Sequence, residues 1–171
     1  MADIFIIFLQ FSLVLGILRI YLDKSGDAFG ILNYGGGSQL LEIKRQADGG
    51  FQAATAWKTA LQGYMSTPVV SERYAYLHLR SQRFTCVDLT TGEQKWTTGP
   101  YGQYWSLVAQ GDRILALDQR GELLLIHATP EKFDLLDSRK ISEQETWGHL
   151  AVSGELVFVR ELNGVSAYRW K

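Results

Sequence analysis

The chain has 171 residues and a formal net charge of −1. It is long enough for one domain with a substantial core, or for four units of about 40 residues, and it has no basic excess to attract nucleic acid. A composition of 46% hydrophobic and 20% charged residues excludes a disordered chain. Seventeen glycines against three prolines, with 12% aromatic residues, favour an all-β protein rich in tight turns.

The first element is an apolar segment, IFIIFLQFSLVLGIL, from Ile4 to Leu18. It is long enough for the core of a signal peptide but shorter than the roughly 20 apolar residues of a membrane-spanning helix. No positive charge precedes it and no small-residue cleavage site follows it. Residues 1–22 are therefore a hydrophobic segment with three open interpretations: signal, anchor or buried strands. Any membrane association is expected to run through residues 4–18.

A repeat follows. Three segments share a short apolar run, a polar turn holding an acid and a second apolar run: VVSERYAYLHL from Val69, LVAQGDRILAL from Leu107 and AVSGELVFVRE from Ala151. Their acids, Glu72, Asp112 and Glu155, are 40 and 43 residues apart. Each segment leads into another turn and a third strand-like run, and two of the units continue into a fourth. Four antiparallel strands in about 40 residues form the unit of a β-propeller blade.

An earlier, less regular unit closes on Trp57, 39 residues before Trp96. The sequence thus predicts an all-β fold, a β-propeller segment of about three and a half four-stranded antiparallel blades within residues 23–171. The expected blades are 31–65, 66–100, 101–145 and 146–171, the last ending after its third strand. In that unit Asn163-Gly164 predicts a two-residue type I′ turn, which needs positive φ at both positions.

Few residues have the spacing of a chemical site. Cys86 is the only cysteine, so an intramolecular disulfide and a cysteine-based zinc site are excluded, and its strand context predicts a small buried hydrophobe. The histidines read as strand or strand-edge residues without metal-ligand spacing: His78, His127 and His149. We therefore predict no catalytic, cofactor-binding or metal-binding residues. The aromatic segment YGQYWS, from Tyr101 to Ser106, is expected to pack at a blade junction, with a stacking platform for sugars or bases as the alternative.

The segment CVDLTTGEQKW, from Cys86 to Trp96, reads as strand, turn and strand. Asp88 is expected to accept hydrogen bonds from the turn, and Gly92 to supply its positive φ. The segment resembles the repeat of the pyrroloquinoline-quinone-like (PQQ-like) propellers, A-x-D-x-x-T-G-x-x-x-W, with Cys86 in place of the alanine. The resemblance covers about residues 34–171. It implies that Thr91 and Trp96 help to dock one blade on the next.

The third unit departs from this repeat, with Pro130-Glu131 where Thr-Gly would fall. The family includes quinoprotein dehydrogenases, which hold a quinone with calcium, and the lipoprotein scaffold that assists outer-membrane barrel assembly. Many of the dehydrogenases carry an adjacent cysteine pair, which a single cysteine cannot form. The acids Asp88, Asp112 and Asp118 all fall in turn contexts, so no calcium or quinone cofactor is expected.

The resemblance therefore implies a non-catalytic scaffold for protein–protein interaction, located outside the cytoplasm in the periplasm or at a membrane. The alternative is part of a quinoprotein-type oxidoreductase whose cofactor residues are not present in this chain. Because a partial propeller leaves exposed blade edges, a protein partner or self-association through those edges is expected, and nucleic acid is not.

Overall fold

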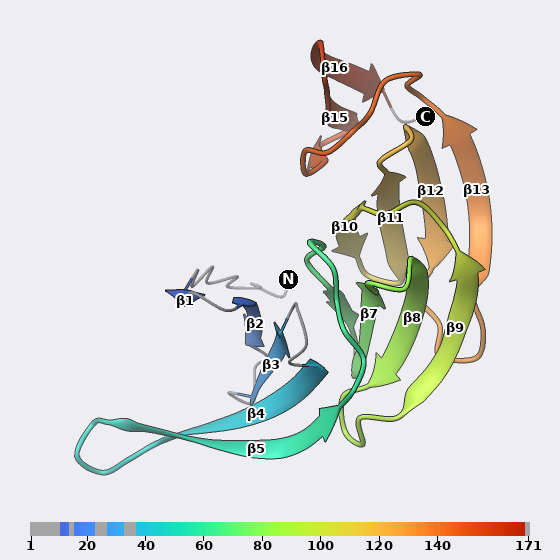
Figure 1. Cartoon of the computed structure of the whole chain (residues 1–171). Coiled ribbons are helices and arrows are strands. Elements are labelled where there is room, and N and C mark those ends of the chain that lie inside the picture. Colours follow the sequence, from blue (N-terminus) through green and yellow to red (C-terminus); the bar gives the residue numbers. More distant parts are fainter. Residues whose placement is uncertain (1–10, 14–15, 23–26, 33–36, 170–171) are drawn as a thin grey trace. The chain divides into compact units, whose positions relative to one another are not determined.

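Short apolar runs separated by glycine-containing or polar turns form antiparallel strands throughout the computed structural model (Figure 1). The structure describes residues 11–13, 16–22, 27–32 and 37–169. These residues form four antiparallel sheets in which the strands follow one another in chain order. Nowhere in the described ranges is there a helix long and apolar enough to cross a membrane. The prediction of an all-β fold is confirmed.

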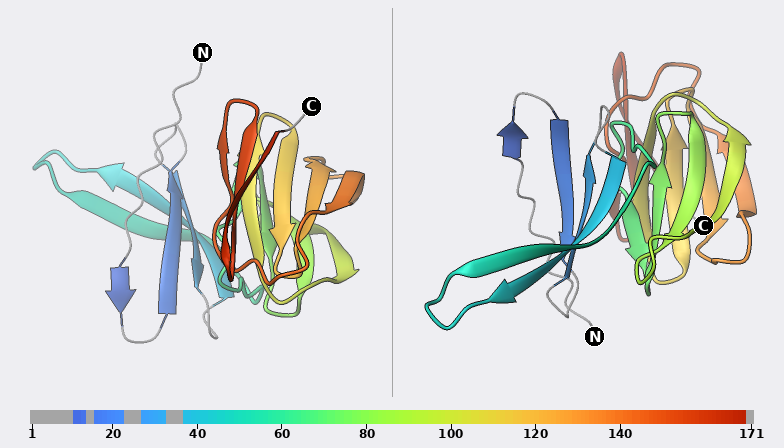
Figure 2. Two further views of the ribbon diagram at one scale, coloured as in Figure 1. Left: turned by 90° about the horizontal axis from the view of Figure 1, so that it is seen from above. Right: turned by 60° about the horizontal axis from the view of Figure 1, so that its bottom comes forward.

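The first sheet has five strands: β1 (Phe11–Leu13), β2 (Gly16–Leu22), β3 (Asp27–Leu32), β4 (Gly37–Arg45) and β5 (Phe51–Thr59). Figure 2 shows the β4–β5 hairpin extending beyond the other strands of this sheet. The second sheet has four strands: β6 (Val69–Ser71), β7 (Tyr74–His78), β8 (Arg83–Asp88) and β9 (Gln94–Pro100).

The third sheet repeats the four-strand pattern: β10 (Trp105–Gln110), β11 (Arg113–Asp118), β12 (Glu122–His127) and β13 (Asp134–Lys140). The last sheet has three strands: β14 (Ala151–Ser153), β15 (Leu156–Glu161) and β16 (Gly164–Arg169). Residues 1–10 and 14–15 of the hydrophobic N-terminal segment lie outside the described residues, as do residues 170–171 at the end of the expected last blade.

Two compact units make up the chain. The first contains the described residues up to Gly63 together with the turn Leu89–Glu93, and the second contains Tyr64–Asp88 and the chain from Gln94 onward.

In the second unit the sheets pack face to face. One cluster joins the second and third sheets: Val69, Tyr76, Phe84, Cys86, Trp105, Leu107, Ile114, Ala116, Leu124 and Ile126. Another joins the third and last sheets: Leu117, Leu123, Leu150, Val157 and Val159. The third sheet is therefore covered on both faces.

The first hairpin of each repeat has a two-residue loop: Glu72-Arg73, Gly111-Asp112 and Gly154-Glu155. The first residue of each loop has a positive φ, of 54° at Glu72, 58° at Gly111 and 56° at Gly154. Glu72 thus occupies the place that glycine takes in the next two repeats. The alignment of Glu72 with the other two turn acids was therefore wrong by one residue.

The turn predicted at Asn163-Gly164 also needs correction. Glu161 pairs with Gly164, so the two loop residues are Leu162 and Asn163. Neither of them has a positive φ, and Gly164 is the first residue of β16. The hairpin exists, but it is not a type I′ turn centred on Asn163-Gly164. The register between β15 and β16 makes Glu161 and Gly164 the pair that closes the hairpin. The local residue composition does not determine this register.

Candidate interaction surface

Trp96 docks the second sheet on the third. It lies opposite Cys86 beside a β-bulge, an irregularity that re-aims side chains. Its indole N–H donates a hydrogen bond of 2.9 Å to the carbonyl oxygen of Thr129, in the turn between β12 and β13. The ring also packs against Tyr76 and Phe84. These contacts give Trp96 the docking role that the resemblance to PQQ-like repeats implied.

Trp57 makes the equivalent contact within the first unit. It lies opposite Leu40 beside a bulge, and its indole N–H donates a 2.7 Å hydrogen bond to the carbonyl oxygen of Leu89. Its ring covers Gly92, where an added Cβ would lie 2.8 Å from the indole. Gly92 has a φ of 75°, as its place in the turn predicted. The Thr91 hydroxyl shapes the same turn by accepting the N–H of residue 93 at 3.2 Å.

The third sheet does not repeat this indole contact. At its corresponding bulge, Leu125 of β12 pairs with Asp137 of β13, which forms an ion pair of 2.9 Å with Arg139. The acid stands where the two preceding sheets carry tryptophan. This departure follows from the loss of the repeat motif in the third unit, which the sequence had indicated at Pro130-Glu131.

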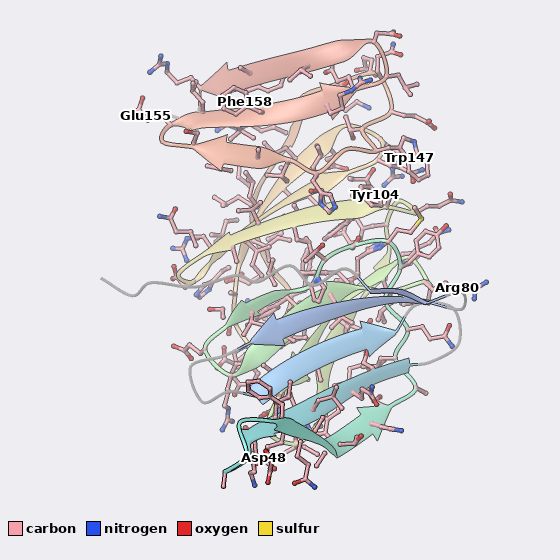
Figure 3. The ribbon with its side chains drawn as sticks, turned by 90° about the vertical axis from the view of Figure 1, so that its left-hand side faces the viewer. Asp48, Arg80, Tyr104, Trp147, Glu155 and Phe158 are labelled. Atoms are coloured by element: carbon pink, nitrogen blue, oxygen red, sulfur yellow. The ribbon has the colours of Figure 1, made fainter. Side chains whose placement is uncertain are left out.

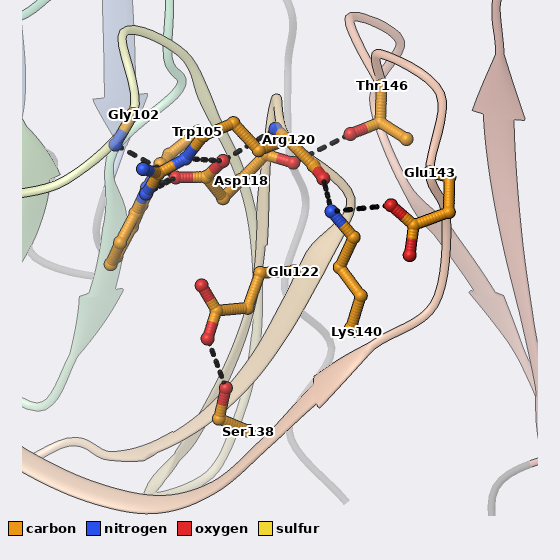
Figure 4. Close-up of polar contacts among 9 residues, drawn as sticks. All are labelled: Gly102, Trp105, Asp118, Arg120, Glu122, Ser138, Lys140, Glu143 and Thr146. Atoms are coloured by element: carbon orange, nitrogen blue, oxygen red, sulfur yellow. Dashed lines mark hydrogen bonds and ion pairs between the residues drawn. The ribbon is translucent and has the colours of Figure 1, made fainter.

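Asp118 accepts several hydrogen bonds within the second unit (Figure 4). Its fully buried carboxylate accepts the Gly102 N–H at 2.9 Å, the Trp105 indole N–H at 3.3 Å and the Arg120 N–H at 2.6 Å. The Arg120 guanidinium adds two hydrogen bonds of 3.1 Å. Burial by itself would raise the pKa of Asp118, but the Arg120 and Gly102 donors outweigh it and lower the pKa. This carboxylate ties the β11–β12 turn to the segment before β10.

His78 and Cys86 are buried in the second sheet. The His78 ring stacks on the Trp105 ring, with centroids 5.3 Å apart. Burial lowers the pKa of His78 to about 4, against the opposing effect of the Asp118 charge, so the imidazole is neutral at neutral pH. Burial raises the pKa of the Cys86 thiol to about 12, which suits packing rather than nucleophilic chemistry. In the described part of the chain no three His, Cys, Asp or Glu residues are grouped so that they could hold a metal ion.

Aromatic side chains stack where the third and last sheets begin. Tyr104 and Trp147 each lie six residues before the end of the first strand of their repeat. Figure 3 shows the two rings beside one another, with centroids 5.8 Å apart and an interplanar angle of 24°. Tyr104 is 3% exposed, whereas Trp147 is 40% exposed. Trp105 is fully buried, so the segment YGQYWS packs at a junction between sheets, as predicted.

Sequence reasoning missed Trp147. The signal was its distance of 43 residues from Tyr104, which equals the distance between the hairpin glycines Gly111 and Gly154. Its indole N–H donates to the Glu145 carboxylate at 2.9 Å. One face of the Trp147 ring stacks on Tyr104, and 40% of the side chain stays exposed.

The last sheet buries one face and exposes the other. Val157 and Val159 of β15 are 2% and 0% exposed and pack on the third sheet. Because side chains alternate along a strand, Leu156 and Phe158 lie on the opposite face. The cross-strand pair Arg160–Val165 places Val165 on that opposite face, where it is 68% exposed. We call Leu156, Phe158 and Val165 the open face.

The edge of the last sheet is open as well. Among the described strands, β16 pairs only with β15. In a hairpin with a two-residue loop the closing pair, here Glu161 and Gly164, is hydrogen-bonded. The N–H and C=O groups of the alternate residues Val165, Ala167 and Arg169 therefore point away from β15. The second and third sheets each have a fourth strand at this place.

Comparison with known proteins identifies the architecture. The structural match to the Cps50 (Swd1) β-propeller domain of Myceliophteria thermophila covers 89% of this chain and 56% of that domain, at 12% identity and a TM-score of 0.63. The match to the computationally designed Ika4 protein covers 89% of each chain, at 9% identity and a TM-score of 0.61. The match to AztD of Citrobacter koseri covers 82% of this chain and 41% of AztD, at 16% identity and a TM-score of 0.56. The fold is that of a β-propeller, as predicted.

Part of the chain also matches a known family. The family model described as outer membrane protein assembly factor BamB matches residues 25–98. No curated protein matches the sequence. With the indole contacts of Trp57 and Trp96, this match over residues 25–98 agrees with the predicted resemblance to PQQ-like β-propeller repeats related to BamB.

Proposed function

We propose that this chain is a non-catalytic propeller scaffold that binds protein through the open face of its last sheet. The observation that carries the proposal is the exposure of Val165, at 68%, beside half-buried Leu156 and Phe158. Apolar side chains gathered on one sheet face favour protein contact over solvent, since clustered apolar surface gains free energy when it is buried. The open edge of β16 supports the same surface, because unpaired backbone groups there can accept a further strand.

The chemistry inside the second unit supports a structural purpose. The Asp118 carboxylate is occupied by donors from Gly102, Trp105 and Arg120. Cys86 is buried with a raised pKa. We also propose that the protein is located outside the cytoplasm, in the periplasm or at a membrane, because the matching family model is described as an outer membrane protein assembly factor.

The proposal is tested by photo-crosslinking in a bacterial host. A photoreactive phenylalanine analogue is placed at Val165, and in a matched control at Leu136 of β13, which is 46% exposed outside the last sheet. We expect protein adducts at position 165 that are absent at position 136. Equal yields at both positions, or no adduct at 165, would contradict a protein-binding role of the open face.

A further inference from the structure

We propose that Asn163 is a site of spontaneous covalent modification, at which the backbone nitrogen of Gly164 displaces the side-chain amide and leaves aspartate and isoaspartate. The two residues follow one another at the tip of the β15–β16 hairpin. Leu162 and Val165, on either side of them, are 57% and 68% exposed, and Asn163 and Gly164 are exposed as well. The modification is independent of the proposed protein-binding role of the open face.

The reaction needs water and no other reagent. The Gly164 nitrogen bonds to Cγ of Asn163 and closes a five-membered succinimide ring, while the Cγ–Nδ2 bond breaks. Nδ2 takes up the proton of the Gly164 N–H and leaves as ammonia. Water then opens the ring at either of its two carbonyl carbons. Opening at Cγ gives aspartate, and opening at the backbone carbonyl carbon gives isoaspartate, in which the chain continues through Cγ.

Glycine makes the attacking nitrogen accessible. Any other residue would place a Cβ beside this atom, and Gly164 has none. Beyond the neighbouring residues, no atom of the described chain lies within 4 Å of the position that a Cβ would take there. The φ of Gly164 is not positive, so alanine fits the same backbone without strain. Alanine at this position therefore hinders the attack while leaving the hairpin unchanged.

The side-chain amide of Asn163 is available for the reaction. It makes no hydrogen bond to the described part of the chain. The contacts at the hairpin tip involve other atoms: Arg160 donates to the Gly164 carbonyl oxygen at 3.1 Å, and the Ser166 hydroxyl donates to the Glu161 carboxylate at 3.3 Å. Neither contact holds Cγ of Asn163 away from the neighbouring nitrogen.

One hydrogen bond opposes the attack. The Gly164 N–H belongs to the closing pair with Glu161, so this pair has to open before the nitrogen can turn towards Cγ. Gly164 is the first residue of β16, and residues 162–165 are all exposed. An exposed terminal pair opens at little cost in free energy, because no buried apolar contact is lost with it.

The other candidate positions in the sequence are less favourable. Asp48 also precedes a glycine, but its carboxylate accepts the Gly50 N–H at 2.9 Å, and a negative carboxylate is a poorer electrophile than an amide. The other asparagine, Asn33, is followed by Tyr34, whose side chain hinders its own nitrogen. The reaction is therefore expected to be selective for Asn163.

Both products alter the hairpin tip. Each places a new negative charge beside Glu161 and lowers the formal net charge of −1 by one unit. Isoaspartate also adds one carbon atom to the backbone between residues 163 and 164. The loop then no longer has the length that pairs Glu161 with Gly164. Aspartate keeps that length, so the two products differ in their effect on the register.

Peptide mapping of the aged, folded chain tests the proposal. The chain is incubated in mildly alkaline buffer and digested with trypsin, which cleaves after Arg160 and Arg169 and releases peptide 161–169 with Asn163. We expect two products whose mass shows the exchange of NH2 for OH, and isoaspartyl methyltransferase should methylate one of them. A digest made before incubation gives the background.

The matched control is Gly164→Ala, whose fold is verified by circular dichroism and which should convert several-fold more slowly. Equal rates in this variant and the wild-type chain would overturn the attack by the glycine nitrogen. The synthetic peptide 161–169 shows that the assay detects the products. If that peptide converts while the folded chain does not, the hairpin protects the pair and the proposal is wrong. Methylation confined to peptide 46–58, with no change of mass, would place the reaction at Asp48 and equally contradict it.

Discussion

The indole N–H of Trp96 lies 2.9 Å from the carbonyl oxygen of Thr129, and this hydrogen bond connects β9 of one sheet to the β12–β13 turn of the next. Trp57 reaches Leu89 in the same way at 2.7 Å. Because both tryptophans lie beside bulges, the repeat fixes the direction of the ring as well as the residue type.

Replacing Trp96 should weaken the second unit. Trp96→Ala removes the hydrogen bond to Thr129 and the ring contacts with Tyr76, Phe84 and Phe133. We expect the free energy of unfolding to fall by about 3 kcal/mol. Trp96→Phe keeps most of the packing and should lose about 1 kcal/mol, the worth of one hydrogen bond. Urea unfolding measures both, and equal losses would show that the ring contacts contribute nothing.

Glycine at position 72 should stabilise the protein. Glu72 has a φ of 54° where Gly111 and Gly154 stand in the following repeats. Glu72→Gly should raise the free energy of unfolding by about 0.5–1 kcal/mol, and Gly111→Ala should lower it by about 1 kcal/mol. Gly111 has open space around an added Cβ, so only the backbone is tested. A lower melting temperature for Glu72→Gly would contradict this interpretation.

Gly92 should tolerate no side chain. An alanine there combines a φ of 75° with a Cβ only 2.8 Å from the Trp57 ring. We expect Gly92→Ala to reduce the free energy of unfolding by about 2 kcal/mol, from strain and displacement of the indole. Gly99→Ala, which meets no atom within 4 Å, is the matched control. Thermal melts of similar midpoint for the two variants would count against the close approach.

Removing the Asp118 carboxylate should leave buried donors without an acceptor. Asp118→Ala strands the Gly102 N–H and the Trp105 indole N–H in the core, and we expect a loss of about 3 kcal/mol. Asp112→Ala removes a carboxylate that is 63% exposed and should change stability by about 0.5 kcal/mol or less. Guanidinium unfolding of the pair provides the comparison, and equal effects would refute the role given to Asp118.

His78 should make the second unit less stable in mild acid. Its folded pKa of about 4 lies below the 6.5 of the free side chain. Between these values the unfolded chain binds the proton and the folded protein does not, so stability falls as pH drops from 6.5 to 4. The full loss is about 3 kcal/mol.

His78 of β7 is equivalent to Leu117 of β11 in the next sheet, so His78→Leu introduces the side chain that the repeat carries there. It should remove the loss of stability between pH 6.5 and 4. Asp118, whose pKa is lowered from 3.8, acts only at lower pH, so the two effects separate. Unfolding curves measured from pH 7 to 4 test this, and an unchanged pH dependence in His78→Leu would disprove the assignment.

Several local features could be predicted from the residues alone. The 39-residue distance from Trp57 to Trp96 indicated the period, and the strand context of Cys86 indicated a buried thiol. Gly92 indicated a turn with positive φ. These features depend on residue type and short-range spacing, which the chain carries whatever its neighbours are.

Tertiary structure decided the rest. The place of Glu72 in its loop, and of Gly164 at the start of β16, depends on which residues pair across the hairpin. The contact between Tyr104 and Trp147 joins the segments that precede the third and the last sheets, 43 residues apart in the chain. The open face of Phe158 and Val165 arises because only one side of the last sheet is covered by the third. Register and packing of distant strands select which side of each strand is buried, and a shift of one residue reverses that choice.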